Sequence, residues 1–360
     1  MKRIIFFAKS MEIGGLEKAL LTLLNGIDHT RYRVTLVLEE KRGAFLARLD
    51  PRVEVREYRL SECPIRPVRR AINLIRRVVW TARNRNAYDF ACSYCTYSVI
   101  GSRLAQAASD NSCLYVHNDY AQILPDPAAF RAFFDSLRAD RFRSVVFVSN
   151  ESRAAFRARC GIAPERLHVI NNLIDADEVR ALAKQPCAVP PAPGCTTLLF
   201  VGRLDEEQKR LSRLLEAMRL ALRSRSDLRL LIVGDGPARR ACEQTVLAQG
   251  LSDRVLLCGA QENPYPYYAA ADALVLTSDY EGFPVVFCEA LLLGLDLFTT
   301  VSVSDGQIDI ADHAVIVPKD AAAIGEALSA YTPQHRPPLD LSAANAQKLD
   351  MLSALIERGE

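Results

Sequence analysis

The sequence predicts an α/β protein built from two Rossmann-like domains. Short runs of Val, Ile, Leu and Phe alternate with helical patterns in both halves of the chain. The 360 residues, 49% of them hydrophobic, are enough for two cores. Residues 185–194, QPCAVPPAPG, interrupt this rhythm with four prolines that cannot continue a helix or a central strand. We therefore expect domains at 1–185 and 186–332, and a helical segment at 333–360 that packs across their junction.

Six apolar runs predict the first sheet, and their continuous hydrophobic character is typical of parallel strands buried on both faces. They are Ile4–Phe7, Val34–Leu38, Val53–Val55, Phe90–Ser93, Leu114–Val116 and Val145–Val148. Helices are expected near 16–24 and 151–160.

Five runs predict the second sheet: Leu198–Val201, Leu228–Val233, Val255–Cys258, Ala273–Thr277 and Leu297–Thr300. A helix is expected from Pro237 and another at 341–357. Parallel sheets bind ligands outside the carboxyl ends of their strands. Two such domains facing each other would place these loops across a cleft.

Composition excludes several classes of protein. A net charge of +2 gives no strong field toward nucleic acid. No apolar run reaches the roughly 18 residues needed to span a bilayer, and the N-terminus has no signal-peptide cleavage site, so we expect a cytoplasmic protein. Among ten cysteines, Cys92 and Cys95 form one C-x-x-C. With no second pair or histidines nearby, we expect structural thiols and no metal.

The segment 281–289, EGFPVVFCE, follows an expected strand and opens a helix after Gly282 and Phe283. Pro284 is suited to helix entry. The free amides at the helix start, on Val285 and Val286, together with the helix dipole, can bind phosphate.

Two carboxylates, Glu281 and Glu289, flank this phosphate site. They would repel a phosphate unless other groups donate hydrogen bonds to them, and sugar hydroxyls are suitable donors. The alternative is that Glu281 caps the helix and Glu289 is a solvated residue on its face.

Two cations follow the first strand of the second domain. Arg203 can make a forked contact with a diphosphate, and Lys209 adds a point charge. Alternatively, both are ordinary surface cations.

Glycines mark two further loops. Gly234-Asp235-Gly236 begins like a dinucleotide fingerprint, but Arg239 stands where the third glycine belongs, so the glycines more plausibly allow a tight turn beside a nucleotide. Gly14 and Gly15 precede a helix and would let the backbone approach a ligand, although a bare strand-to-helix turn fits as well.

His117 ends a strand of the first domain, within Tyr115-Val116-His117-Asn118-Asp119. From that position an imidazole can reach the cleft. A satisfied core histidine is the alternative, and the motif alone does not decide between them.

The segment 66–85 is rich in arginine and is interleaved with apolar residues. Its arginines are Arg66, Arg69, Arg70, Arg76, Arg77, Arg83 and Arg85. Such a basic amphipathic helix, here with Trp80, can lie on an anionic membrane surface. A core-packed helix with a solvated basic face explains the pattern equally well.

As a set and in this order, these loops resemble the retaining glycosyltransferases of family four, which have the two-domain GT-B architecture. The resemblance covers about residues 4–330. It rests on Gly14-Gly15, His117, Val148-Ser149, Ile170–Asp175, Gly202-Arg203-Leu204 with Lys209, Gly234-Asp235-Gly236, and Glu281 to Glu289. Leu173 stands where the family usually has glycine, no proline follows Gly294, and residues 302–310 match loosely.

The resemblance implies residue roles. Arg203 and Lys209 would neutralise the donor diphosphate, and Glu289 would hold the ribose. Glu281 would contact the donor sugar, while His117 would lie near the donor sugar and the acceptor. The Gly15 region would touch phosphate.

The implied reaction moves a sugar from a UDP- or GDP-linked donor to a glycan or lipid-linked acceptor. It retains anomeric configuration, needs no metal or other cofactor, and serves cell-surface polysaccharide synthesis. A basic first domain often accompanies lipid-linked acceptors in such families, which suggests an enzyme peripheral to the inner face of the cell membrane. Competing interpretations are a nucleotide-sugar epimerase of the same architecture, a non-catalytic sugar-nucleotide-binding protein and a Rossmann oxidoreductase.

Overall fold

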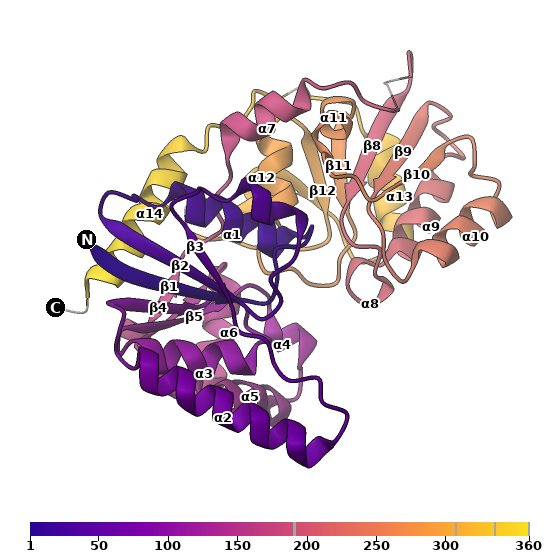
Figure 1. The fold of residues 1–360 in the computed structure, drawn as a ribbon. Coiled ribbons are helices and arrows are strands. Elements are labelled where there is room, and N and C mark those ends of the chain that lie inside the picture. The colour runs from indigo at the N-terminus through magenta and orange to yellow at the C-terminus, as the bar shows by residue number, and fades with distance from the viewer. Residues whose placement is uncertain (190–191, 307, 335, 359–360) are drawn as a thin grey trace. The chain divides into compact units, whose positions relative to one another are not determined.

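The computed structural model describes residues 1–189, 192–306, 308–334 and 336–358. The chain forms two compact units (Figure 1). The N-terminal unit comprises Met1–Leu173 with Ala344–Glu360, and the C-terminal unit comprises Ile174–Ala343. Residues 190 and 191 of the expected linker lie outside the described residues.

The boundary between the units falls before helix α7 (Ala176–Ala183) rather than at residue 185. This helix packs against α11 (Tyr265–Ala269), and Asn263 Nδ2 donates a 3.1 Å hydrogen bond to the Leu182 carbonyl. The C-terminal helix α14 (Ser342–Glu357) lies mainly in the N-terminal unit. There Asn111 Nδ2 donates to the Leu355 carbonyl at 3.0 Å.

The N-terminal unit contains a seven-stranded parallel sheet with the order β3-β2-β1-β4-β5-β6-β7. Its strands are β1 (Lys2–Ala8), β2 (Tyr32–Leu38), β3 (Glu54–Glu57), β4 (Phe90–Ser93), β5 (Ser112–Val116), β6 (Ser144–Phe147) and β7 (Leu167–Val169). The predicted α/β class is thus confirmed. The seventh strand, β7, is an addition to the six strands predicted from the sequence.

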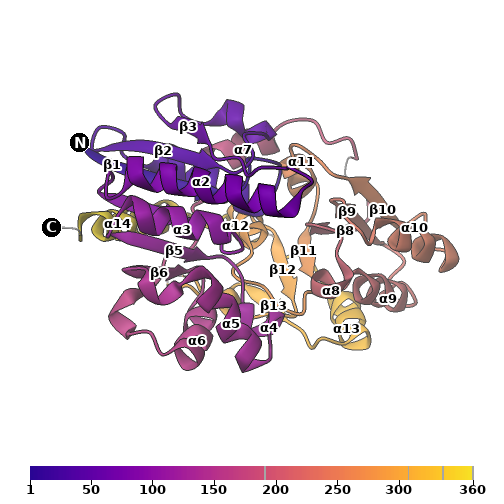
Figure 2. The same cartoon turned by 60° about the horizontal axis from the view of Figure 1, so that its bottom comes forward.

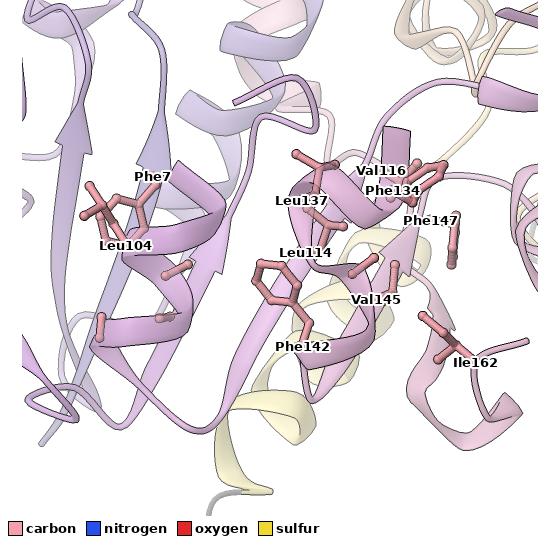
Figure 3. Packing of buried hydrophobic residues seen from close by; sticks show 14 of the residues in the cluster. Phe7, Leu104, Leu114, Val116, Phe134, Leu137, Phe142, Val145, Phe147 and Ile162 are labelled. Atoms are coloured by element: carbon pink, nitrogen blue, oxygen red, sulfur yellow. The ribbon is translucent and has the colours of Figure 1, made fainter. Parts of the chain in front are cut away.

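Helices cover both faces of this sheet (Figure 1). They are α1 (Gly15–Gly26), α2 (Arg66–Asn84), α3 (Val99–Ala108), α4 (Tyr120–Ile123), α5 (Pro127–Leu137), α6 (Asn150–Cys160) and α14, with short 3-10 turns at Ala44–Arg48, Ala139–Arg141 and Pro164–Arg166. Buried side chains such as Leu104 and Phe142 fill the space between the strands and α3 and α5 (Figure 3). This packing holds the carboxyl ends of the strands in place.

The C-terminal unit contains a six-stranded parallel sheet with the order β10-β9-β8-β11-β12-β13. Its strands are β8 (Thr196–Val201), β9 (Leu228–Val233), β10 (Val255–Gly259), β11 (Ala273–Leu276), β12 (Asp296–Thr299) and β13 (Ala314–Ile316). Its further helices are α8 (Glu206–Lys209), α9 (Leu211–Ala221), α10 (Arg239–Ala248), α12 (Val285–Leu292), α13 (Ala321–Ala330) and a 3-10 turn at Ile310–Asp312.

Each sheet has one place where the strand order reverses direction. In the N-terminal unit this topological switch point lies between β1 and β4, and in the C-terminal unit it lies between β8 and β11. Loops that leave neighbouring strands at a switch point run to opposite sides of the sheet, which opens a natural binding site between them.

Two glycines fix how the β8 and β9 loops meet. Gly234 has φ +144°, and a Cβ there would lie 1.9 Å from the Gly202 carbonyl oxygen. At Gly236, with φ +155°, a Cβ would lie 2.5 Å from the Leu204 carbonyl oxygen. Leu204 N also donates to the Asp235 carbonyl at 2.9 Å. The two loops therefore pack backbone against backbone, as the expectation of a tight turn requires.

This close approach predicts that Gly234→Ala destabilises the C-terminal unit. The methyl group would displace the β8 loop, in addition to the roughly 1–2 kcal/mol cost of a left-handed backbone for a non-glycine residue. Gly250→Ala is the matched control, because Gly250 has φ +67° but nothing within 4 Å of its Cβ position. Calorimetric unfolding should show a larger loss for Gly234→Ala, and equal losses would contradict the steric argument.

Candidate active site

A buried ion pair lies at the switch point of the second sheet. Lys209 ends α8, which follows β8, and Glu281 lies in the loop after β11. Lys209 Nζ is 2.6 Å from Glu281 Oε1, with side chains only 13% and 7% exposed. The interpretation of Lys209 as an ordinary surface cation is therefore wrong, and so is that of Glu281 as a helix cap, because no side chain caps α12.

Neighbouring groups hold this pair in position. Gln208 Nε2 donates to the Tyr280 carbonyl at 3.2 Å and to Glu281 Oε2 at 3.4 Å. Asp279 N donates to the Gln208 carbonyl at 2.8 Å, and Arg213 forms a 2.8 Å ion pair with the Asp279 carboxylate. Burial opposes ionisation of Asp279, but its hydrogen bonds with Arg210 and Arg213 together lower the pKa of this carboxyl. These contacts bind α8 to the β11 loop.

The β8 and β9 loops, which carry Gly202 and Gly234, lie next to the same ion pair. A Cβ at Gly202 would be 3.7 Å from Lys209 Cε, so the lysine stem runs along the backbone of the β8 loop. Because Gly234 packs on Gly202, the structure brings Lys209, Glu281, the β8 loop and the β9 loop together.

Arg203 behaves differently from Lys209. Its side chain is 64% exposed and forms a 2.8 Å ion pair with Asp205, the N-cap residue of α8. An arginine in this position can turn toward an anion only by giving up a solvent-screened pair, which costs little.

Helix α12 begins directly after the Glu281 loop, with Pro284 as its N-cap. Gly282 and Phe283 are buried, and Val285 and Val286 are half-buried. Since no side chain caps this helix, its first-turn amides stay available for an anion, as expected for a phosphate-binding helix start.

Glu289, on α12, is buried rather than solvated. Tyr265 Oη donates to its Oε1 at 2.8 Å, and Tyr268 Oη donates to its Oε2 at 3.0 Å. Burial and the nearby carboxylate raise the pKa of Tyr268, so this phenol stays a donor. Two phenols therefore orient the carboxylate.

Sequence reasoning did not identify Tyr265 and Tyr268. The signal was present in the run of tyrosines at 265–268, YPYY. Nothing in that run, however, indicates that its hydroxyls reach Glu289, more than 20 residues further along the chain.

In the N-terminal unit, the Gly14-Gly15 loop leads from β1 into α1. Gly14 has an extended backbone with φ −170°, and a Cβ at Gly15 would meet nothing within 4 Å. Neither position requires glycine for its conformation. The open space at Gly15 instead leaves its backbone accessible to a ligand.

His117 follows β5 and stacks on two tyrosines. Its ring lies 4.7 Å from that of Tyr115, nearly parallel at 10°, and 4.4 Å from that of Tyr94. Neither ring nitrogen has a partner at hydrogen-bonding geometry, although the Tyr94 backbone and the Asn172 side chain are close enough to oppose the pKa shift. Burial dominates and lowers the pKa of His117 to about 3. The imidazole is thus buried, neutral and able to accept a hydrogen bond.

A parallel α/β sheet with a cation and a free helix start at its switch point defines a class of protein that binds phosphate-bearing ligands. The family models agree and are more specific. Residues 13–178 match Glycosyltransferase Family 4, and residues 195–332 match Glycosyl transferases group 1. The chain belongs to the family-4 type of glycosyltransferases with the GT-B fold.

Individual relatives are distant. The lipopolysaccharide 1,6-galactosyltransferase of Escherichia coli is 29% identical over 183 residues, which are 48% of this chain and 47% of that protein. A Campylobacter jejuni N-acetylgalactosamine-N,N'-diacetylbacillosaminyl-diphospho-undecaprenol 4-alpha-N-acetylgalactosaminyltransferase is 29% identical over 130 residues, 36% of this chain and 33% of that protein. The chain therefore spans a third to a half of the length of these two relatives.

Among solved structures, Anabaena HepE in complex with UDP and glucose has a TM-score of 0.75 at 19% sequence identity. The match covers 98% of this chain and 100% of HepE. At this identity the match establishes the fold.

The low pKa of His117 predicts a pH-dependent stability of the N-terminal unit. In the unfolded chain His117 binds a proton with a pKa near 6.5, whereas in the folded protein its pKa is about 3. Stability due to neutral His117 is thus complete above about pH 6.5 and falls as pH drops toward 3, by up to about 1.4 kcal/mol per pH unit.

The variant His117→Gln should flatten this dependence. Fluorescence of Trp80, the single tryptophan, reports on the core because it packs against Phe7 and Tyr58. Urea midpoints at pH 7, 6, 5 and 4 measure the slope in wild type and variant. His168 has a pKa lowered to about 4 and keeps some slope in both proteins. Identical slopes in the two proteins would contradict the buried neutral imidazole.

Proposed function

We propose that this protein is a retaining glycosyltransferase. It moves a sugar from a UDP- or GDP-linked donor to a glycan or lipid-linked acceptor in the synthesis of a cell-surface polysaccharide. The observation that supports this most strongly is the buried Lys209–Glu281 pair at the switch point of the second sheet, directly before the uncapped start of α12.

The charges of this site suit the departure of a nucleoside diphosphate. The bond from the anomeric carbon to the diphosphate oxygen breaks, and a bond to an acceptor oxygen forms as the acceptor hydroxyl loses its proton. Negative charge grows on the leaving diphosphate, where a preorganised cation and helix amides stabilise it. Lys209 and the Val285 and Val286 amides fill this role, with Arg203 as a mobile second cation.

The carboxylates have separate tasks in this proposal. Glu281 accepts hydrogen bonds from hydroxyls of the donor sugar while Lys209 turns toward the phosphate. Glu289, held by its two tyrosines, accepts from the ribose hydroxyls. In the N-terminal unit, the open backbone at Gly15 meets phosphate, and neutral His117 accepts a hydrogen bond from a hydroxyl near the reacting sugar.

The names of similar proteins support a UDP-linked donor and a lipid-linked acceptor. HepE was solved with UDP and glucose. The C. jejuni protein, by its name, extends a diphospho-undecaprenol-linked acceptor, and the E. coli protein acts on lipopolysaccharide. A donor bearing UDP and an acceptor joined to a lipid are therefore the combination that we propose first.

Helix α2 supports a membrane-bound acceptor. It lies along the surface of the N-terminal unit beside α3 (Figure 2), and none of its residues is buried. Val68, Ile75 and Val79 recur at i, i+7 and i+11 on its exposed side, and they are 44%, 62% and 42% exposed. This outer apolar face supports the membrane-surface interpretation over that of a core-packed helix with a solvated basic face.

The charges on α2 suit an anionic membrane. The helix carries six arginines and no Asp or Glu. Trp80 anchors it by packing against Phe7 and Tyr58. No helix among the described residues is long and apolar enough to cross a bilayer. We propose that α2 lies in the headgroup region of an anionic leaflet.

Loss of Lys209 should lower turnover at least tenfold, equivalent to about 1.4 kcal/mol of transition-state stabilisation. Release of nucleoside diphosphate from a panel of nucleotide sugars measures it, and an NMR assignment of the product anomer tests retention. Lys209→Met alone leaves Glu281 buried and unpaired, which costs stability. The double variant Lys209→Met/Glu281→Gln avoids this cost and should be equally inactive.

Lys184→Ala is the control, because this exposed lysine is not one of the residues assigned to the site. Near-wild-type turnover in the double variant would show that the site is misplaced. An epimerase would instead return an altered nucleotide sugar without releasing the diphosphate. A non-catalytic protein would bind the nucleotide sugar unchanged.

The exposed face of α2 predicts binding to vesicles that contain anionic lipid, which should weaken as salt is raised. Ile75→Ser/Val79→Ser should reduce the partition coefficient at least about tenfold, because two side chains lose their burial in the lipid. Leu247→Ser is a matched control, since Leu247 is 75% exposed on α10 of the other unit. Co-sedimentation measures both, and no binding of wild type at low salt would rule out the membrane surface.

A further inference from the structure

A second charged site lies in the N-terminal unit, apart from the residues assigned above. It is a cavity of about 460 Å³ lined by Lys9, Arg77, Arg103 and Glu39, with Tyr97 and Val99 among its other walls. Lys9 follows β1, Glu39 follows β2, and Tyr97 follows β4. The cavity thus lies outside the carboxyl ends of the strands, beside the β1/β4 switch point where such sheets bind ligands.

Three cations face one carboxylate in this cavity. Within the described chain, neither Lys9 nor Arg77 has a carboxylate at ion-pairing distance, although surface arginines elsewhere are paired, as Arg52 is with Asp50. Glu39 is engaged by the Ser98 hydroxyl. The lining of the cavity therefore carries more positive than negative charge.

Arg103 is the most constrained of the three cations. It donates from Nη2 to the Ser136 carbonyl at 3.0 Å, while its buried Nε has no hydrogen-bond partner. Burial, followed by the like charges of Arg138, Arg77 and Arg141, lowers the pKa of Arg103. An anion in the cavity would relieve this repulsion and supply an acceptor.

The cavity also has exposed apolar walls. Leu60, Tyr97 and Val99 line it and are 39%, 50% and 45% exposed. A ligand here can place an anionic group among the cations and an apolar chain along these side chains.

We propose that this cavity binds the phosphate of an amphiphilic acceptor, with Lys9, Arg77 and Arg103 as its ligands. The inference rests on the proposed function and specifies its acceptor: a sugar carried on a lipid phosphate or diphosphate. The anionic group fixes the acceptor's position in the N-terminal unit, while the donor diphosphate is held at the switch point of the other sheet.

Farnesyl diphosphate is a suitable probe, and calorimetric titration of the full chain measures its affinity. Lys9→Gln/Arg77→Gln should weaken binding at least tenfold. Both residues are exposed, so the fold should survive, which Trp80 fluorescence checks. Arg66→Gln/Arg70→Gln removes the same charge from α2 outside the cavity and should change affinity less than twofold.

Several results would overturn the inference. Equal weakening in the two double variants would mean general charge attraction. Equal binding of farnesol would mean an apolar site, and equal binding of inorganic pyrophosphate would mean a site for free phosphate. Displacement by UDP or GDP would place the probe in the donor site.

The proposed function has an independent readout. Wild-type release of nucleoside diphosphate from nucleotide sugars, with water in place of the acceptor hydroxyl, tests cleavage of the donor bond independently of the acceptor. If that release is absent while the probe binding behaves as expected, the proposed function fails and the anion site stands. If release occurs but the variants bind the probe as wild type does, the inference alone fails.

Discussion

The ion pair between Lys209 and Glu281 is the constraint on which the candidate site depends. Two nearly buried, opposite charges are retained in a folded chain only when geometry and further hydrogen bonds compensate for their desolvation. Here Gln208 and the Asp279–Arg213 contact supply that support. The pair keeps a cation at the sheet's switch point with little exposure to solvent, and in the proposed function this cation exchanges Glu281 for phosphate.

Much of this architecture follows directly from the sequence. Strands β4 and β9 begin and end at the predicted residues, because continuous apolar runs bounded by polar turns allow few other structures. The short edge strands β7 and β13 have three residues each, too few for a periodic pattern to register. The boundary between the units falls before α7 rather than in the proline-rich segment. The reason is that α7 packs against α11 of the C-terminal unit, a tertiary contact that composition does not indicate.

The site was predictable to a similar degree. Glu281 and Lys209 were identified by their positions after strands, yet their contact depends on the strand order, which the sequence does not state. The environments of Glu289 and His117 were beyond sequence reasoning for a related reason. Tyr265 and Tyr268 lie more than 20 residues before the carboxylate they bind, and the rings beside His117 come from two different strand ends. For α2, periodicity alone could not show which face was left exposed.

The most direct test is a crystal structure of the protein soaked with UDP or GDP. The account predicts a β-phosphate in contact with Lys209 Nζ and the first amides of α12, with the Glu281 carboxylate released from its lysine. Electron density for the nucleotide at any other place, with the Lys209–Glu281 pair intact, would contradict it.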